Sequence, residues 1–182
     1  MRTNPALSVA LAALLLSGCT AHGPVHMPTP SPSPTPVFAS DEEALAAAEA
    51  AYREYLRVSD EIAQDGGANP ERIAEVVTDD RLPSELDALA KFPARKVHSV
   101  GNSIFGTASL QQYSDIGGTV LIDIYTCLDV SGVRLISESG TDVTPERQDK
   151  LSLVIGLESA PASPGRLLVS DSDVWDGVSF CE

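Results

Sequence analysis

The sequence is poor in positive charge. It contains 12 Lys and Arg residues against 26 Asp and Glu residues, and its formal net charge is −14 at pH 7. Proteins that bind nucleic acids or anionic lipid surfaces attract them with a surplus of basic side chains. The composition therefore argues against both classes, and any attachment to a membrane must depend on something other than charge.

The common catalytic and metal-binding motifs are also missing. The sequence has no GxSxG, no HExxH, no Gly-rich phosphate loop and no set of four metal ligands. His22 and His26 lie in a proline-rich stretch, so His98 is the only histidine in the region expected to fold. The acidic cluster around Asp171 and Asp173 lacks the ordered ligand spacing of a known calcium site. We expect no metal and no cofactor.

What is present begins with an export signal. One cation, Arg2, precedes the uncharged apolar run 6–16, which is too short to span a bilayer and is followed by small residues. Leu16-Ser17-Gly18-Cys19 resembles a bacterial lipobox. The resemblance implies cleavage after residue 18 and acylation of Cys19 by chains such as palmitate. The bilayer then holds the protein through its lipid, on the extracytoplasmic face of the cell membrane.

Only two cysteines remain once the lipobox cysteine is set aside, Cys127 and Cys181. In an exported domain, two remaining cysteines most often form a disulfide. The sequence contains no CxxC, and neither cysteine has a histidine close by. A reactive thiol is the alternative. We predict a structural disulfide that closes a loop of about 54 residues and contributes roughly 4 kcal/mol.

A spacer separates the lipobox from the domain. Residues 20–38 include six prolines and no formal charge, a composition that favours an extended polyproline II conformation over a packed core. We therefore divide the chain into a signal peptide at residues 1–18, a lipidated cysteine and tether at 19–39, and a single domain at 40–182.

The domain is predicted to begin with helices. Ser40 starts a capping box, and apolar residues then recur at three- and four-residue steps as far as Gly66-Gly67. This pattern indicates a helix of about 24 residues. Two shorter helices are expected over residues 69–78 and 83–92, the second of them ended by Pro93.

From residue 96 onward the pattern favours strands, because β-branched residues alternate with polar ones. Gly117-Gly118 and Ser131-Gly132 indicate hairpin turns. Alternation along the third strand places Asp123, Tyr125 and Cys127 on one face. The predicted strands cover residues 96–105, 108–113, 118–129, 133–137, 151–158 and 166–174.

Three helices followed by a strongly curved antiparallel sheet resemble the nuclear transport factor 2-like cone, which SnoaL-like polyketide cyclases and ketosteroid isomerases share. The chain also resembles lipoproteins of high-GC Gram-positive bacteria, on the lipobox, the spacer and the stretches ALAAAEAAY (44–52), YTCLDVSGV (125–133) and VWDGVSFC (174–181). The resemblance implies an α+β fold with three N-terminal helices packed on a curved, mostly antiparallel sheet of about six strands.

Fold alone does not supply a function, because this cone hosts enzymes as well as binding modules. We expect a non-catalytic protein of the cell envelope that binds a small apolar ligand or an envelope partner. Tyr52, Tyr55 and Trp175 are the candidate ligand contacts, since aromatic side chains are common in pockets. Tyrosines on a long helix are also typical core residues. Trp175 either lines the mouth of the cone or covers the core beside the disulfide.

Two other functions remain open. The first is a cyclase- or isomerase-like enzyme with His98 or Asp123 as the base and Tyr125 as a hydrogen-bond donor in the cone. The second is a structural or assembly protein whose cone is filled by side chains. Because cones of this type often pair through the sheet, a homodimer is compatible with the resemblance.

Overall fold

The computed structural model describes residues 35–106 and 108–181, so the predicted lipobox, Cys19 and most of the tether lie outside the described residues. In these ranges the elements are α1 (Asp41–Gln64), the 3₁₀ helix η1 (Pro70–Glu75), α2 (Leu82–Leu89), α3 (Lys91–Arg95), β1 (Val97–Val100), β2 (Ile104–Phe105), β3 (Ser109–Ile116), β4 (Thr119–Asp129), β5 (Arg134–Ser137), β6 (Lys150–Ala160) and β7 (Ser163–Val174). None of the described helices is both long and apolar enough to cross a membrane.

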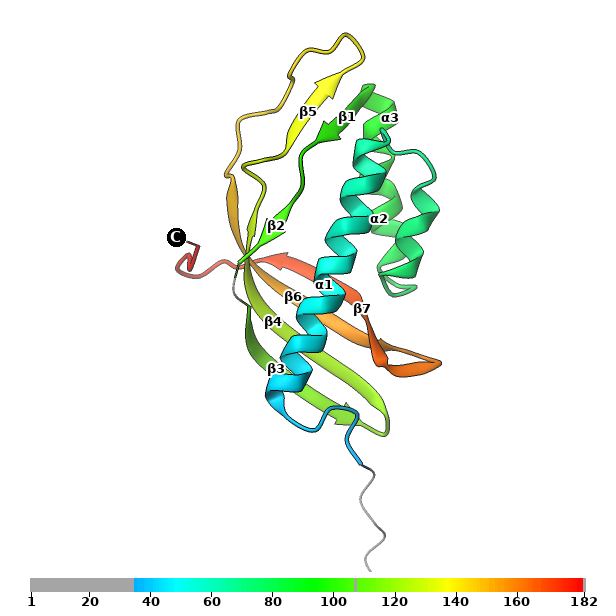
Figure 1. Ribbon diagram of the computed structural model, residues 1–182, viewed down its shortest axis with the longest axis vertical. Coiled ribbons are helices and arrows are strands. Elements are labelled where there is room, and N and C mark those ends of the chain that lie inside the picture. The colour runs from blue at the N-terminus through cyan, green and yellow to red at the C-terminus, as the bar shows by residue number, and fades with distance from the viewer. Residues whose placement is uncertain (1–34, 107, 182) are drawn as a thin grey trace, which may run out of the picture. The chain divides into compact units, whose positions relative to one another are not determined.

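The long first helix is confirmed. The Ser40 hydroxyl accepts a hydrogen bond from the backbone N–H of Glu43, and the Glu43 carboxylate reaches back to the N–H of Ala39. Both bonds satisfy donors that a helix N-terminus otherwise leaves unpaired. Gly66 and Gly67 end the helix with positive φ angles of 68° and 84°. Figure 1 shows α1 running across the sheet formed by β3, β4, β6 and β7.

The two shorter helices differ from the prediction. Asn69 has a left-handed backbone with φ of 49°, makes no side-chain cap, and leads into a 3₁₀ helix instead of an α-helix. Pro93 does not end the third helix, because α2 already stops at Leu89 and Pro93 lies inside α3. Pro93 is the third residue of α3, where an N–H would have no partner within the helix, so proline is tolerated there.

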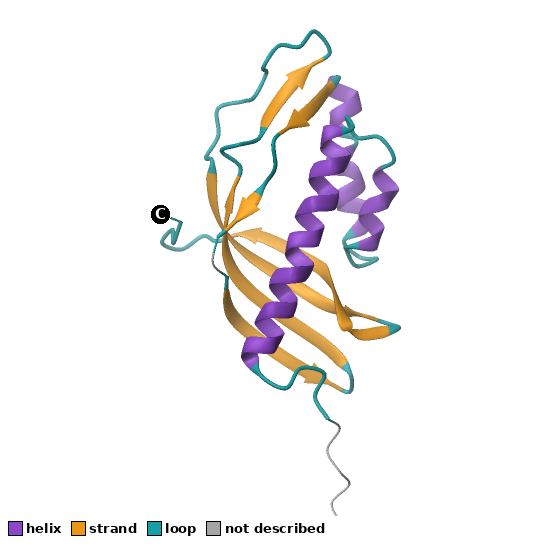
Figure 2. Cartoon of the chain, in the orientation of Figure 1, coloured by secondary structure: helices purple, strands orange, loops and turns teal. Residues whose placement is uncertain are grey.

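The main sheet is antiparallel, with β4 and β6 at its centre, β7 beside β6, and both β2 and β3 paired with β4. Gly117 and Gly118 form a two-residue turn between β3 and β4, with φ angles of 65° and 88°. Positive φ at both positions is the type I′ geometry that matches the twist of a hairpin. The first predicted glycine turn is therefore confirmed. Figure 2 shows the helices gathered on one side of this curved sheet.

The second predicted hairpin is wrong. Ser131 and Gly132 do form a turn, closed by a hydrogen bond from the N–H of Val133 to the carbonyl of Val130. The strand that follows, β5, pairs with β1 in a separate two-stranded sheet. The predicted strand 96–105 is accordingly split at Gly101, where the backbone has φ of 85° and a Cβ atom would overlap the carbonyl oxygen of Gly132. This close approach requires glycine.

The core lies between the inner face of the main sheet and the helices. β4 contributes Val120, Ile122 and Ile124, and α1 contributes Tyr52 and Ile62, all of them at most 1% exposed. The rest of this buried cluster comes from α1, the shorter helices, the strands and the segments between them: Phe38, Ala44, Ala48, Leu56, Val58, Ile73, Val76, Val77, Leu89, Ala108, Leu153, Ile155, Leu157, Leu167 and Val169. Side chains therefore occupy the space between helix and sheet.

Phe38, which the sequence placed in the tether, belongs to this core. Its ring lies 6.1 Å from the Tyr113 ring, centroid to centroid, and its N–H donates to the Tyr113 hydroxyl. The N–H of Val37 donates to the Asp115 carboxylate at 2.8 Å. The packing of the domain thus begins before the cap of α1.

One inward-facing residue of β4 is a polar exception. Thr126 is fully buried, and its hydroxyl has no hydrogen-bond partner among the described residues. Replacing it by valine exchanges an unpaired hydroxyl for a methyl group, so Thr126→Val should raise the free energy of unfolding by about 1 kcal/mol, measured by urea denaturation. Thr119→Val, at the exposed start of the same strand, is the control and should change it by less than about 0.5 kcal/mol. A destabilised Thr126→Val variant would contradict the assignment.

Candidate functional site: an aromatic groove on the outer face of the sheet

The outer face of the main sheet, opposite α1, carries the residues that the sequence singled out on β4. Val120, Ile122 and Ile124 point into the core, and the residues between them point outward. Asp123, Tyr125 and Cys127 therefore share the outer face, as the alternation predicts.

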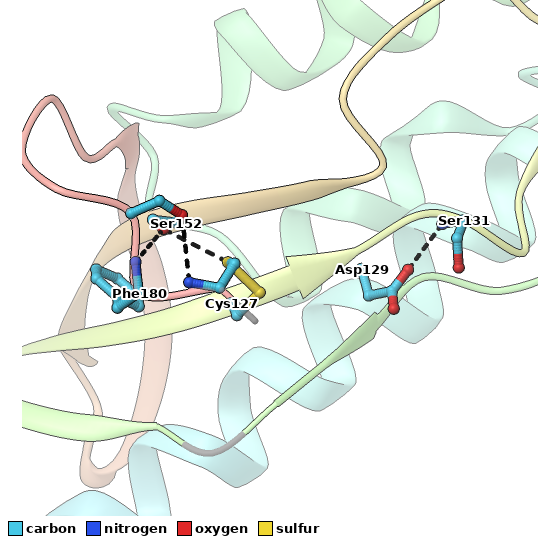
Figure 3. The surroundings of a disulfide bond; sticks show 7 residues. Cys127, Asp129, Ser131, Ser152 and Phe180 are labelled. Atoms are coloured by element: carbon cyan, nitrogen blue, oxygen red, sulfur yellow. Dashed lines mark hydrogen bonds between the residues drawn. A yellow bond between two sulfur atoms is a disulfide. The ribbon is translucent and has the colours of Figure 1, made fainter.

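A disulfide between Cys127 and Cys181 ties the C-terminal segment, residues 175–181, to this face. The predicted pairing is thus present in the structure. Ser152 of β6 adds hydrogen bonds to the backbone of this segment. Its hydroxyl accepts from the N–H of Phe180 at 3.1 Å, and its carbonyl accepts from the N–H of Trp175 at 2.8 Å. The same hydroxyl also lies 3.1 Å from that of Ser179. Figure 3 shows Ser152 and Phe180 beside the bridge.

Three aromatic rings meet where this segment crosses the strands. The ring of Trp175 lies 5.3 Å from that of Tyr125 at an interplanar angle of 74°, and the ring of Phe180 lies 5.9 Å from it at 69°. With Ser109 and Val178 they line a groove of about 590 Å³, which we call the aromatic groove. This size is typical of small-molecule sites. Val178 is 91% exposed, so the groove presents apolar surface to solvent.

The backbone at Gly177 lies directly against the indole of Trp175. A Cβ atom at residue 177 would overlap the indole ring of Trp175, including its Nε1. The chain therefore passes over the indole at a distance that only glycine allows. Within the segment VWDGVSFC, Trp175 therefore supplies the ring, and Gly177 leaves the space that the ring occupies.

Carboxylates lie on the same face of the sheet as the groove. Across the strands β4, β6 and β7, Tyr125, Val154 and Asp173 lie side by side. In the next outward-facing row, Asp123, Gly156 and Asp171 are neighbours in the same way. Because Gly156 has no side chain, the two flanking carboxylates face each other. Burial raises the pKa of Asp123, and the charge of Asp171 raises it further.

The tyrosines of α1 do not reach the aromatic groove. Tyr52 is 1% exposed and packs its ring against those of Tyr55 and Phe105. Burial raises the pKa of both tyrosine hydroxyls. The Tyr55 hydroxyl donates to the buried Glu85 carboxylate at 3.1 Å, and Glu85 also accepts from Arg81. The structure thus places both tyrosines in the core, on the other side of the sheet from Trp175.

His98 is not brought together with the other catalytic candidates. It lies on β1, in the two-stranded sheet, where it lines a surface depression of about 630 Å³ with Pro93, Lys96 and Glu138 among its neighbours. Asp123 and Tyr125 lie on the outer face of the main sheet. Within the described ranges, no group of three His, Cys, Asp or Glu side chains is placed to hold a metal ion.

The sequence predicts the bridge and names Tyr125 as a catalytic candidate and Trp175 as a ligand contact, but it does not single out Phe180 or Val178. Both residues lie in the closing stretch 174–181, between Trp175 and Cys181. The signal was available, because a disulfide at Cys181 must bring the preceding residue to the face that carries Cys127.

No family model matches the chain, and no curated protein matches it either. Solved structures do. The intermembrane space region of the chloroplast protein ARC6 matches with a TM-score of 0.50 at 11% identity, over 71% of this chain and 95% of that one. The periplasmic domain of DotI matches with a TM-score of 0.49 at 15% identity, over 77% and 98%. ActVI-ORFA from Streptomyces coelicolor matches with 0.41 at 18% identity, over 75% and 97%.

At these identities the likeness concerns the fold alone. The chain is an α+β protein whose helices pack on a curved antiparallel sheet, which is the architecture of the nuclear transport factor 2-like cone. The predicted fold class is confirmed, with a short extra helix and one more strand than expected in the described ranges.

Proposed function

We propose that the protein is an extracytoplasmic, lipid-anchored binding protein that holds a small apolar ligand in the aromatic groove and does not transform it. The observation that carries this proposal is the groove itself, in which Tyr125, Trp175 and Phe180 form apolar walls open to solvent. Aromatic walls bury a large apolar area for each side chain, so they suit a ligand of this kind.

The inner side of the cone offers less support for a ligand site. Tyr52, Ile62, Ile122 and Ile124 fill it together with the rest of the buried cluster. A filled cone also agrees with the structural or assembly alternative, but that alternative gives no role to solvent-facing rings fixed by a disulfide. Binding on the outer face accounts for both features.

The proposal of a lipid anchor is based on the sequence at residues 16–19. An apolar leader followed by Leu16-Ser17-Gly18-Cys19 supplies the acylation site, and the proline-rich spacer supplies reach from the membrane. An acidic protein with net charge −14 gains nothing from anionic lipid, which makes acylation of Cys19 the means of attachment that we propose.

Trp175 makes the proposal directly testable, because it is the only tryptophan in the sequence. The mature chain from residue 19, exported without acylation as Cys19→Ser, should bind the uncharged fluorescent probe N-phenyl-1-naphthylamine saturably, with energy transfer from the indole. Phe180→Ala removes one wall of the groove and should weaken binding about tenfold. Ile116→Ala is the matched control, since Ile116 is 73% exposed at the distant β3–β4 turn, and it should leave the affinity unchanged.

Equal binding by wild-type protein and Phe180→Ala, or no saturable binding at all, would refute a ligand site in the groove. Gel filtration of the same samples examines a homodimer as the alternative. A dimer that Phe180→Ala converts to monomer would show that the rings form a protein interface.

A further inference from the structure

We propose that the ligand of the aromatic groove is an organic cation, with an ammonium nitrogen carried among methyl or methylene groups. This inference rests on the proposed function and deepens it by naming the chemical class of the ligand. It follows from the combination of ring geometry and charge on the outer face of the sheet.

The rings are arranged as walls and not as a stack. Trp175 and Phe180 both stand at steep angles to Tyr125, 74° and 69°. Each ring carries negative charge density on its faces, and a cation within about 6 Å of a ring centroid is attracted to it. Perpendicular walls let one alkylated ammonium group touch more than one ring, which is how aromatic sites recognise quaternary ammonium ligands.

Two exposed carboxylates, Asp173 and Asp176, lie close to Trp175 in the sequence. Asp173 lies on the outer face two residues before Trp175, a spacing of about 7 Å along a strand. Asp176 follows Trp175 directly, and both carboxylates are exposed. Among the described residues, neither Asp173 nor Asp176 takes part in a salt bridge.

Among the described residues, those that line the groove carry no positive charge. They are Ser109, Tyr125, Trp175, Val178 and Phe180. Arg81, which reaches the outer face at Asp171, is held by that carboxylate at 3.2 Å and by Glu85 at 2.8 Å. Asp173 and Asp176 would repel an anionic ligand, and a neutral ligand would make no use of them. A cation satisfies the rings and the acids together.

Comparing choline with 3,3-dimethylbutan-1-ol tests the effect of the ligand's charge at constant shape. The two compounds differ only in that choline has a positively charged nitrogen where the alcohol has a neutral carbon. Titrated against Trp175 fluorescence in the Cys19→Ser mature chain, choline should bind at least tenfold more tightly. Asp173→Asn should weaken choline binding about threefold and leave the neutral alcohol unaffected, since a charge at this distance acts on the cation alone. Asp87→Asn on α2 changes the net charge equally and is the matched control, with no effect on either ligand.

The outcomes distinguish this inference from the function on which it rests. Equal affinities for choline and the alcohol would overturn the cation while leaving an apolar site in the groove. Binding of neither compound would also overturn it, and the naphthylamine titration would then decide separately whether the groove binds apolar ligands. Choline binding that is unchanged in Phe180→Ala would place the cation outside the groove and would refute the inference as well.

Discussion

Replacing Cys127 and Cys181 together by serine is expected to lower the free energy of unfolding by about 4 kcal/mol. The bridge closes a loop with a sequence separation of 54, and constraining a loop of that length in the unfolded chain gives a stabilisation of about this size. Urea denaturation of the variant and of wild-type protein measures the difference. Dithiothreitol should shift the wild-type midpoint to that of the variant and leave the variant itself unchanged.

The same double variant should lose ligand binding under conditions in which it remains folded. Without the bridge, residues 175–181 keep the hydrogen bonds of Ser152 to the backbone of Trp175 and Phe180 and to the Ser179 hydroxyl. They also keep the contacts of the two aromatic rings with Tyr125. Each of these contacts contributes about 1 kcal/mol, and together they are too weak to hold seven residues in one position, because ordering each residue costs about 1–2 kcal/mol. Unaltered probe affinity in a folded, bridge-free variant would show that the groove forms without the disulfide.

Arg81→Met should destabilise the domain by about 3 kcal/mol, because it leaves a buried carboxylate without its charged partner. Glu85 is only 6% exposed and is held by the Nε of Arg81 at 2.8 Å and by the Tyr55 hydroxyl at 3.1 Å. After the substitution the neutral hydroxyl alone remains. Denaturation at neutral pH measures the loss, and the exposed contact of Arg81 with Asp171 adds little to it.

Two further variants make this prediction specific. Adding Glu85→Leu to Arg81→Met removes the uncompensated charge and should recover most of the lost stability. Arg57→Met disrupts an exposed arginine paired with Glu54 and Glu61, and it should cost less than about 1 kcal/mol. If Arg81→Met costs no more than Arg57→Met, the Glu85 carboxylate does not depend on Arg81 to balance its buried charge.

The elements that the sequence predicts best are those decided by local chemistry. The cap at Ser40, the end of α1 at Gly66 and Gly67, and the turn at Gly117-Gly118 all depend on a few adjacent residues. The alternation along β4 identifies both faces of the sheet, because a strand with one buried face repeats every two residues.

The errors occur where distant parts of the chain decide. Ser131-Gly132 has turn chemistry, but the partner of the following strand is set by the close passage of Gly101 against Gly132, which no local pattern reveals. Pro93 reads as a stop signal, although it fits the first turn of a helix that starts two residues earlier. The first error concerns which strands pair, on which periodicity contains no information. The second concerns where a helix begins, because proline is tolerated in a first turn but not in a helix interior.

In the candidate site, too, local patterns predict some features, and long-range contacts decide the others. Alternation and cysteine pairing place Tyr125 and the bridge on one face, and the bridge then brings Phe180 to Tyr125. The side of the sheet on which Tyr52 and Tyr55 lie follows from packing that involves Phe105 and Glu85, residues far away in sequence. The groove itself exists only because the C-terminal segment folds back.

Because the groove needs this fold-back, the candidate site depends on whether the disulfide has formed. The wall that carries Phe180 and Trp175 is completed by a covalent bond that forms in oxidising compartments and not in a reducing cytosol. A newly made chain awaiting export would therefore have its rings but no groove. If the protein is exported as proposed, the site matures only at its destination, and ligand in the cytosol cannot occupy it beforehand.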